Sequence, residues 1–175
     1  PRRNTTVDSA MSSIARVEPM NDWGDDERRL TDSVSVLVGD ANGAYPSGNT
    51  LLVRGAGESV VIDPSVTVVA RGGAPVPVDA VINSHSHEDH MAGNGSFPDA
   101  RLHIHVEDLP GAQSIDGLMA VYGLTGTARS EFERVILDEF HYAPRPDAEG
   151  FSDGDVFELG GGGSGEAVHL PGHTR

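Results

Sequence analysis

From Val34 onward, short apolar runs rich in β-branched residues alternate with turn residues. Runs of this kind, separated by Gly, Pro and Asn, are typical of consecutive β-strands. Further along, Leu102, Ile104 and Val106 alternate with polar positions, which is the periodicity of a strand. The pattern predicts strands over residues 34–39, 49–55, 59–64, 78–84 and 99–108.

Two segments after these strands are predicted to be helical, residues 114–123 and 127–140. In the second, apolar residues recur at spacings of three and four and share one face: Phe132, Val135, Ile136 and Phe140. For residues 151–175 the pattern predicts a strand, a turn and another strand. The run GGGGSG at 160–165 lacks the Lys and Ser/Thr of a phosphate-binding loop, so we interpret it as a hairpin turn. Strands followed by alternating strands and helices predict a mixed α/β or layered α+β domain.

The length of 175 residues corresponds to one domain. Residues 1–33 are polar and charged, and we predict an irregular lead-in that packs through Trp23 and Leu30. The folded domain is predicted to cover residues 34–175.

The chain is strongly acidic, with a formal net charge of −15, and its 12 basic residues are all arginine. A surface of this sign repels phosphate backbones, so nucleic acid is not an expected partner. Because the chain has no cysteine, only nitrogen and oxygen donors are available to a metal. No apolar run approaches the roughly 20 residues that span a bilayer, and the first residues lack the apolar core of a secretory signal. We therefore expect a cytoplasmic protein without a membrane partner.

Three of the 8 histidines lie between His85 and His90, directly after the predicted strand 78–84. In an extended loop, side chains two positions apart point to the same side, so His85 and His87 can converge on one cation. Asp89 and His90 are then available to a neighbouring cation. Imidazole and carboxylate donors suit Zn²⁺ first, and Fe, Mn, Co and Ni are also compatible. The alternative is a solvated polar loop, but this density of donors after a buried strand favours a metal site.

His173 lies on the turn PGHT after a predicted strand at residues 167–170, and it can complete a three-histidine site. Glu88 points away from its neighbours in an extended loop, and we predict that it is solvated. The remaining histidines belong to no motif. We interpret them as structural or exposed, or leave them unassigned: His103, His105, His141 and His169.

The motifs HSHEDHMAGN (85–94) and HLPGHT (169–174) together resemble the metallo-β-lactamase-fold superfamily of metallohydrolases. GNTLLV (48–53) and VVIDPS (60–65) are similar to the opening strands of that family, and the resemblance runs from about residue 34 to the end. It implies an αββα sandwich of two similar halves. These 175 residues would cover the N-terminal half and the start of the second.

The resemblance also implies roles for individual residues. His85, His87 and His173 would bind the first metal, and Asp89 and His90 the second. Asp63 would be a supporting residue near the site. The family places a metal-bridging aspartate and a further histidine downstream of the PGHT turn, whereas this chain ends two residues after His173. We therefore expect a fragment, or a chain completed by a C-terminal segment or an oligomeric partner.

The implied function is that of a metal-dependent hydrolase that holds one or two ions, Zn²⁺ first and Fe or Mn as alternatives. A metal-bound hydroxide, oriented by the catalytic Asp89, would attack an ester, thioester, lactone, lactam or phosphodiester in a small-molecule substrate. Two alternatives stay open. One is a non-catalytic, metal-binding remnant that needs a partner chain, and the other resembles the iron-dependent branch of the family that oxidises persulfides.

Overall fold

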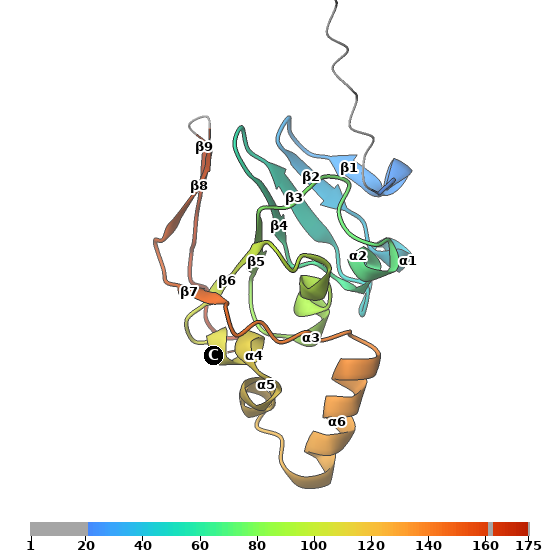
Figure 1. Ribbon diagram of the computed structural model, residues 1–175, viewed down its shortest axis with the longest axis vertical. Helices are drawn as coiled ribbons and strands as arrows, with labels where there is room; N and C mark the ends of the chain where they lie inside the picture. Colours follow the sequence, from blue (N-terminus) through green and yellow to red (C-terminus); the bar gives the residue numbers. More distant parts are fainter. Residues whose placement is uncertain (1–20, 161–162, 175) are drawn as a thin grey trace, which may run out of the picture.

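A seven-stranded mixed β-sheet is the main element of the computed structural model, which describes residues 21–160 and 163–174 (Figure 1). The strands lie in chain order; β1 to β4 pair antiparallel and β4 to β7 pair parallel. Parallel strands have their carboxyl ends at one edge, so the loops after β5 and β6 lie at the same edge of the sheet. The strands are β1 (Glu27–Arg29), β2 (Val34–Leu37), β3 (Thr50–Arg54), β4 (Ser59–Ile62), β5 (Ala80–Asn83), β6 (Arg101–His105) and β7 (Glu149–Phe151).

Helices cover one face of this sheet, and a hairpin of β8 (Val156–Gly160) and β9 (Gly163–Glu166) stands against the other (Figure 1). Most of the predicted strands and helices are present with slightly different bounds, and the layered α/β architecture is confirmed. The strand predicted at residues 167–170 is wrong: the last strand is β9, which ends at Glu166, and residues 167–170 have no regular secondary structure. The glycine-rich turn of the hairpin includes residues 161–162, which lie outside the described part. The helical elements are η1 (Gly24–Asp26), α1 (Asp40–Gly43), α2 (Val66–Ala70), α3 (Glu88–Met91), η2 (Asn94–Ser96), α4 (Leu109–Gln113), α5 (Ile115–Tyr122) and α6 (Gly126–Asp138).

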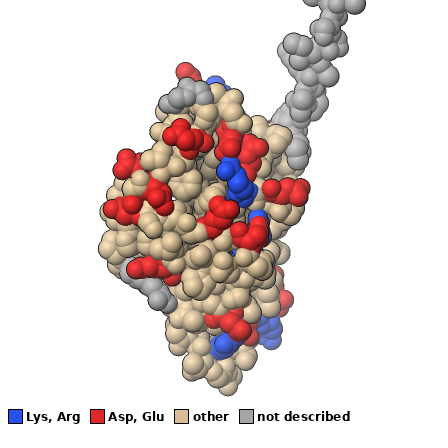
Figure 2. Space-filling view, turned by 60° about the vertical axis from the view of Figure 1, so that its left-hand side comes forward, with Lys and Arg blue, Asp and Glu red and all other residues tan. Residues whose placement is uncertain are grey.

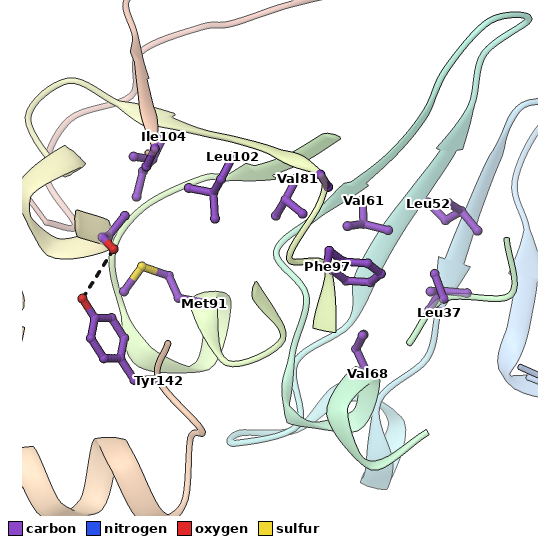
Figure 3. Close-up of a cluster of buried hydrophobic side chains, with 14 of the residues drawn as sticks. Leu37, Leu52, Val61, Val68, Val81, Met91, Phe97, Leu102, Ile104 and Tyr142 are labelled. Carbon is purple, nitrogen blue, oxygen red and sulfur yellow. Dashed lines mark hydrogen bonds between the residues drawn. The ribbon is translucent and has the colours of Figure 1, made fainter. Parts of the chain in front are cut away.

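The hydrophobic core lies between the sheet and the helices (Figure 3). Because side chains alternate between the faces of a strand, one residue from each of β3 to β6 aligns in a row on the helical side. These four are at most 1% exposed: Leu52, Val61, Val81 and Leu102. Helical and loop side chains pack onto the row, among them Val68, Met91, Phe97, Leu118 and Ile136. Each such buried side chain contributes about 1.5–3 kcal/mol, so this row anchors the sheet beneath the candidate site.

The opposite face of the sheet is covered only by the hairpin, within the described part of the chain. Ile62 and Ile82 point from the sheet toward Phe157 and Leu159 of β8, and these side chains line a common cavity. The hairpin contacts the turn between β3 and β4, where the backbone N–H of Gly57 donates a hydrogen bond of 3.3 Å to the carbonyl oxygen of Leu159. At the adjoining Gly55 an added Cβ would lie 1.9 Å from the same oxygen, so this approach requires glycine.

The segment before residue 34 is more ordered than we expected. Residues 24–26 form η1, and β1 pairs with β2, which satisfies backbone groups that an irregular segment would leave to water. Trp23 is buried in the core as predicted. The prediction for Leu30 is wrong, since this side chain is 62% exposed. The rest of the predicted lead-in, residues 1–20, lies outside the described part of the chain.

Acidic side chains outnumber arginines over the face shown in Figure 2, in line with the net charge of −15. Such a surface favours the approach of cations and disfavours polyanions. Among the described residues, no helix has both the length and the apolar character needed to cross a membrane.

Candidate metal centre

Three histidine rings from two distant segments meet near the carboxyl ends of the parallel strands β5 and β6. His85 and His87 lie on the loop after β5, and His173 lies on the turn that follows β9. Their ring centroids are 4.6 to 4.8 Å apart, and each ring offers a nitrogen within 4.8 Å of the other two. The structure thus brings together the three residues that the sequence predicts as ligands of one metal.

The local environment favours the neutral, metal-binding form of two of these imidazoles. Burial, followed by the neighbouring His90 and His87, lowers the pKa of His85 to about 4. Burial and then His173 lower the pKa of His87. Nδ1 of His85 lies 2.8 Å from Oγ of Ser84, whereas its buried Nε2 has no hydrogen-bond partner among the described residues. A buried ring nitrogen without a hydrogen-bond partner is available as a ligand to a cation at this position.

His90 and Asp89 lie beside the three-histidine cluster. The His90 ring is 4.1 Å from that of His85, and its Nε2 is 3.7 Å from Oδ2 of Asp89. Within the described residues, Asp89 and His90 do not join a third donor in a group as compact as the three histidines. At the second predicted metal position the structure therefore brings together two donors, Asp89 and His90.

Asp63, predicted as a supporting residue, orients both His90 and the loop before His85. Its Oδ2 lies 3.0 Å from Nδ1 of His90, and its Oδ1 accepts a hydrogen bond of 2.7 Å from the backbone N–H of Ser84. Burial acts to lower the pKa of His90, but the carboxylates of Asp63, Asp89 and Glu88 together outweigh it and the pKa is raised. Asp63 adopts a φ of 54°, a left-handed conformation that is rare outside glycine. Such backbone strain clusters at functional sites.

The prediction that Glu88 is solvated is wrong. Residues 88–91 form the short helix α3 rather than an extended loop, which turns Glu88 inward to 9% exposure. Its carboxylate accepts a hydrogen bond of 3.2 Å from the hydroxyl of Tyr45 and a second from the hydroxyl of Tyr122. The Tyr122 ring stacks on the His87 ring at 5.4 Å, and burial raises the pKa of Tyr122. Glu88 thus supports a ligand candidate through Tyr122.

Asp108 is a supporting residue that the sequence did not reveal. This carboxylate is 4% exposed and accepts a hydrogen bond of 2.6 Å from the hydroxyl of Ser86. It accepts another of 3.0 Å from the hydroxyl of Thr174. Its position just after a strand end was the only available signal, because neither partner is near it in sequence.

A cavity of about 410 Å³ between the sheet and the hairpin opens onto the cluster. Its walls are largely apolar and include Ile62, Ile82 and Phe157, while His85 and His173 lie at its polar side. Apolar walls with a few convergent polar groups are typical of sites for small molecules.

Comparison with known proteins places the chain in a family. Residues 45–175 match the model of the metallo-beta-lactamase superfamily. A beta-lactamase domain protein from Burkholderia ambifaria is similar in structure, with a TM-score of 0.52 and 18% identity over 77% of this chain and 47% of that one. A metallo-beta-lactamase family protein from Thermus thermophilus has a TM-score of 0.57 and 19% identity over 83% of this chain and 54% of its own. No curated protein matches the chain.

At these identities the two structures show likeness of fold, and the chain spans about half of their length. The family model covers most of the chain, and its match includes both histidine motifs. The chain belongs to the metallo-beta-lactamase superfamily.

Proposed function

We propose that the chain carries the metal centre of a hydrolase, with His85, His87 and His173 as ligands of one divalent cation. The observation that carries this proposal is the convergence of their nitrogens to within 4.8 Å from two distant segments. Three protein donors with an open position are typical of catalytic zinc, so Zn²⁺ is the first candidate. Fe and Mn are the alternatives.

When bound, such a cation polarises the carbonyl or phosphoryl oxygen under attack and lowers the pKa of a water molecule to about 7. Asp89 is the catalytic residue of the proposal, because a carboxylate at this edge can accept a hydrogen bond from the attacking water and orient it. His90, 3.7 Å from Asp89, adds a donor for a second cation. Asp63 holds the His90 ring and does not itself act on the substrate.

The cavity indicates the kind of substrate. Its apolar walls suit the non-reacting part of a small molecule, with the scissile bond directed toward His85 and His173. The bond is an ester, thioester, lactone, lactam or phosphodiester. A polyanionic substrate is disfavoured by the acidic surface (Figure 2).

Metal content tests the first part of the proposal. The chain is loaded with Zn²⁺, freed of excess ion and analysed by elemental mass spectrometry beside His87→Ala and His141→Ala. His141 is an exposed histidine outside the three-histidine cluster, so it is the matched control. We expect His87→Ala to hold one equivalent less than the wild type and His141→Ala to hold the same. Equal metal content in all three proteins would contradict the proposal.

Turnover is a separate test, because the chain spans about half of its structural relatives. Chromogenic lactam, lactone, thioester and phosphodiester substrates are offered with added Zn²⁺. We expect hydrolysis of at least one, abolished in His87→Ala and strongly reduced in Asp89→Asn. Bound metal without turnover on any of them would instead support a non-catalytic metal-binding chain.

A further inference from the structure

A second group of metal-ligating side chains lies outside the centre described above. His105 is the last residue of β6, Glu107 follows two positions later, and His169 lies three residues after β9. Each offers a ligand atom within 4.8 Å of those of the other two. We call these three residues the outer cluster. Their ligand atoms, like those of His85, His87 and His173, all lie within 4.8 Å of one another. The sequence shows no motif that joins them.

Backbone hydrogen bonds hold both segments of the outer cluster in place. His105 pairs with Phe151 of β7, and the N–H of Val106 donates to the carbonyl oxygen of Phe151 at 2.9 Å. On the other segment, the backbone N–H of His169 donates to Oδ1 of Asp153 at 2.9 Å. The backbone of both segments is therefore held in place by partners outside the outer cluster.

The side chains themselves are largely free to bind. The His105 and His169 rings stack at 4.2 Å with an interplanar angle of 20°. Within the described part of the chain, the one hydrogen bond to these side chains is a long contact of 3.4 Å from the N–H of Glu107 to Nδ1 of His105. The lone pair of a ring nitrogen lies in the plane of the ring, so one of the two stacked rings turns about its side-chain bonds when both bind one ion. Two His and one Glu are a donor set that binds zinc.

We propose that His105, Glu107 and His169 form a second binding site for a divalent transition-metal ion, with Zn²⁺ as the first candidate and Ni²⁺ or Cu²⁺ as alternatives. Three protein donors leave a coordination position for water or for an anionic group of a ligand. Glu107 and His169 are exposed, so an ion can reach the site from solvent.

The outer cluster is linked to the first centre through the chain and through the cavity. His169 precedes His173 by four residues, and both line the cavity of about 410 Å³ together with His105. An ion in the outer cluster ties the segment that carries His173 to the end of β6. It therefore restricts that segment and favours binding at the first centre, and by linkage the first centre favours the outer one.

Zinc stoichiometry in two backgrounds tests this proposal. The chelator-treated chain is titrated with Zn²⁺ by calorimetry, as wild type and with His85 and His87 both replaced by alanine. In each background His105→Ala, His169→Ala and His141→Ala are compared, and circular dichroism checks the fold. We expect His105→Ala and His169→Ala each to lose one equivalent in both backgrounds, while His141→Ala loses none.

The double background separates this proposal from the function proposed above, because it removes the first centre and leaves the outer cluster intact. Residual zinc binding there that depends on both His105 and His169 supports the outer site, even if the first centre binds nothing. A loss with His169→Ala that occurs only in the wild-type background would trace to displacement of His173 and would overturn the outer site. Unchanged stoichiometry in both variants would overturn it as well.

Discussion

Thr174 and Asp108 lie 66 positions apart in the sequence, and the hydroxyl of Thr174 donates a hydrogen bond of 3.0 Å to the buried carboxylate of Asp108. The same carboxylate accepts a hydrogen bond from Ser86, which lies between His85 and His87. Because Thr174 follows His173 directly, one buried side chain joins the two segments that carry the proposed ligands. Asp108 is thus a positioning residue for the candidate metal centre.

Replacement of Asp108 should therefore weaken metal binding. In Asp108→Ala the buried hydroxyl of Ser86 loses its acceptor, at a cost of about 1–3 kcal/mol in unfolding free energy. Zinc affinity, measured by competition with a chromophoric chelator, should fall as well, and Asp108→Asn should retain part of it. Asp99→Ala is the control, since Asp99 is an exposed aspartate. Undiminished affinity in Asp108→Ala would show that the two segments are positioned by other contacts.

A methyl group at Gly111 should disturb the same loop through Ser86. An added Cβ there would lie 2.8 Å from Cβ and 2.9 Å from Oγ of Ser86. Overpacking of this kind costs about 1–3 kcal/mol, although alanine otherwise favours a helix. We expect Gly111→Ala to lower both the unfolding free energy and zinc affinity. Gly48→Ala, where the added methyl meets nothing within 4 Å, should change neither.

The two tyrosines that bind Glu88 should differ in their contribution to stability. Tyr122 is partly buried and stacks on His87, whereas Tyr45 is 68% exposed. Loss of the Tyr122 hydroxyl leaves a buried carboxylate short of a donor, at about 1–3 kcal/mol, while water can replace the Tyr45 hydroxyl. Urea unfolding should therefore rank Tyr122→Phe as clearly less stable than Tyr45→Phe. The reverse order would contradict the burial of this contact.

The Arg145–Asp147 pair should make a small, pH-dependent contribution. Arg145 donates two hydrogen bonds, 2.9 and 2.7 Å, to the Asp147 carboxylate and lowers its pKa to about 2 from the usual 3.8. Since the folded pKa is the lower one, the contribution is complete above about pH 4 and is lost as the pH falls toward about 2. Asp147 is 63% exposed, so the effect is modest.

Asp147→Asn measures that contribution directly. The difference in unfolding free energy between wild type and variant, followed by urea denaturation at constant ionic strength, should be constant from neutral pH down to about pH 4 and should shrink below it. A difference that grows on acidification would mean that Asp147 is not stabilised in its charged form.

Local periodicity made much of the fold predictable. The strands that carry Leu52, Val61, Val81 and Leu102 are predicted by short apolar runs and the turn residues between them. The spacing of Ile136 and Phe140 identifies the buried side of α6 and of the residues just after it. Each of these patterns repeats within a few residues, at the scale of a strand or helix period. The edge strand β1 has no such pattern, because its burial is low and its order comes from pairing with β2.

The spacing within residues 85–90 by itself determined that His85 and His87 can share a cation, and the family motif pointed to His173. The tertiary structure decided what supports them. Glu88 is buried because α3 turns it toward Tyr122. Asp108 reaches Ser86 and Thr174 only because β6 pairs with β5 within the sheet and the hairpin packs against that sheet. Contacts between residues so far apart leave no periodic trace in a sequence, because they depend on how whole elements pack and not on the local path of the backbone.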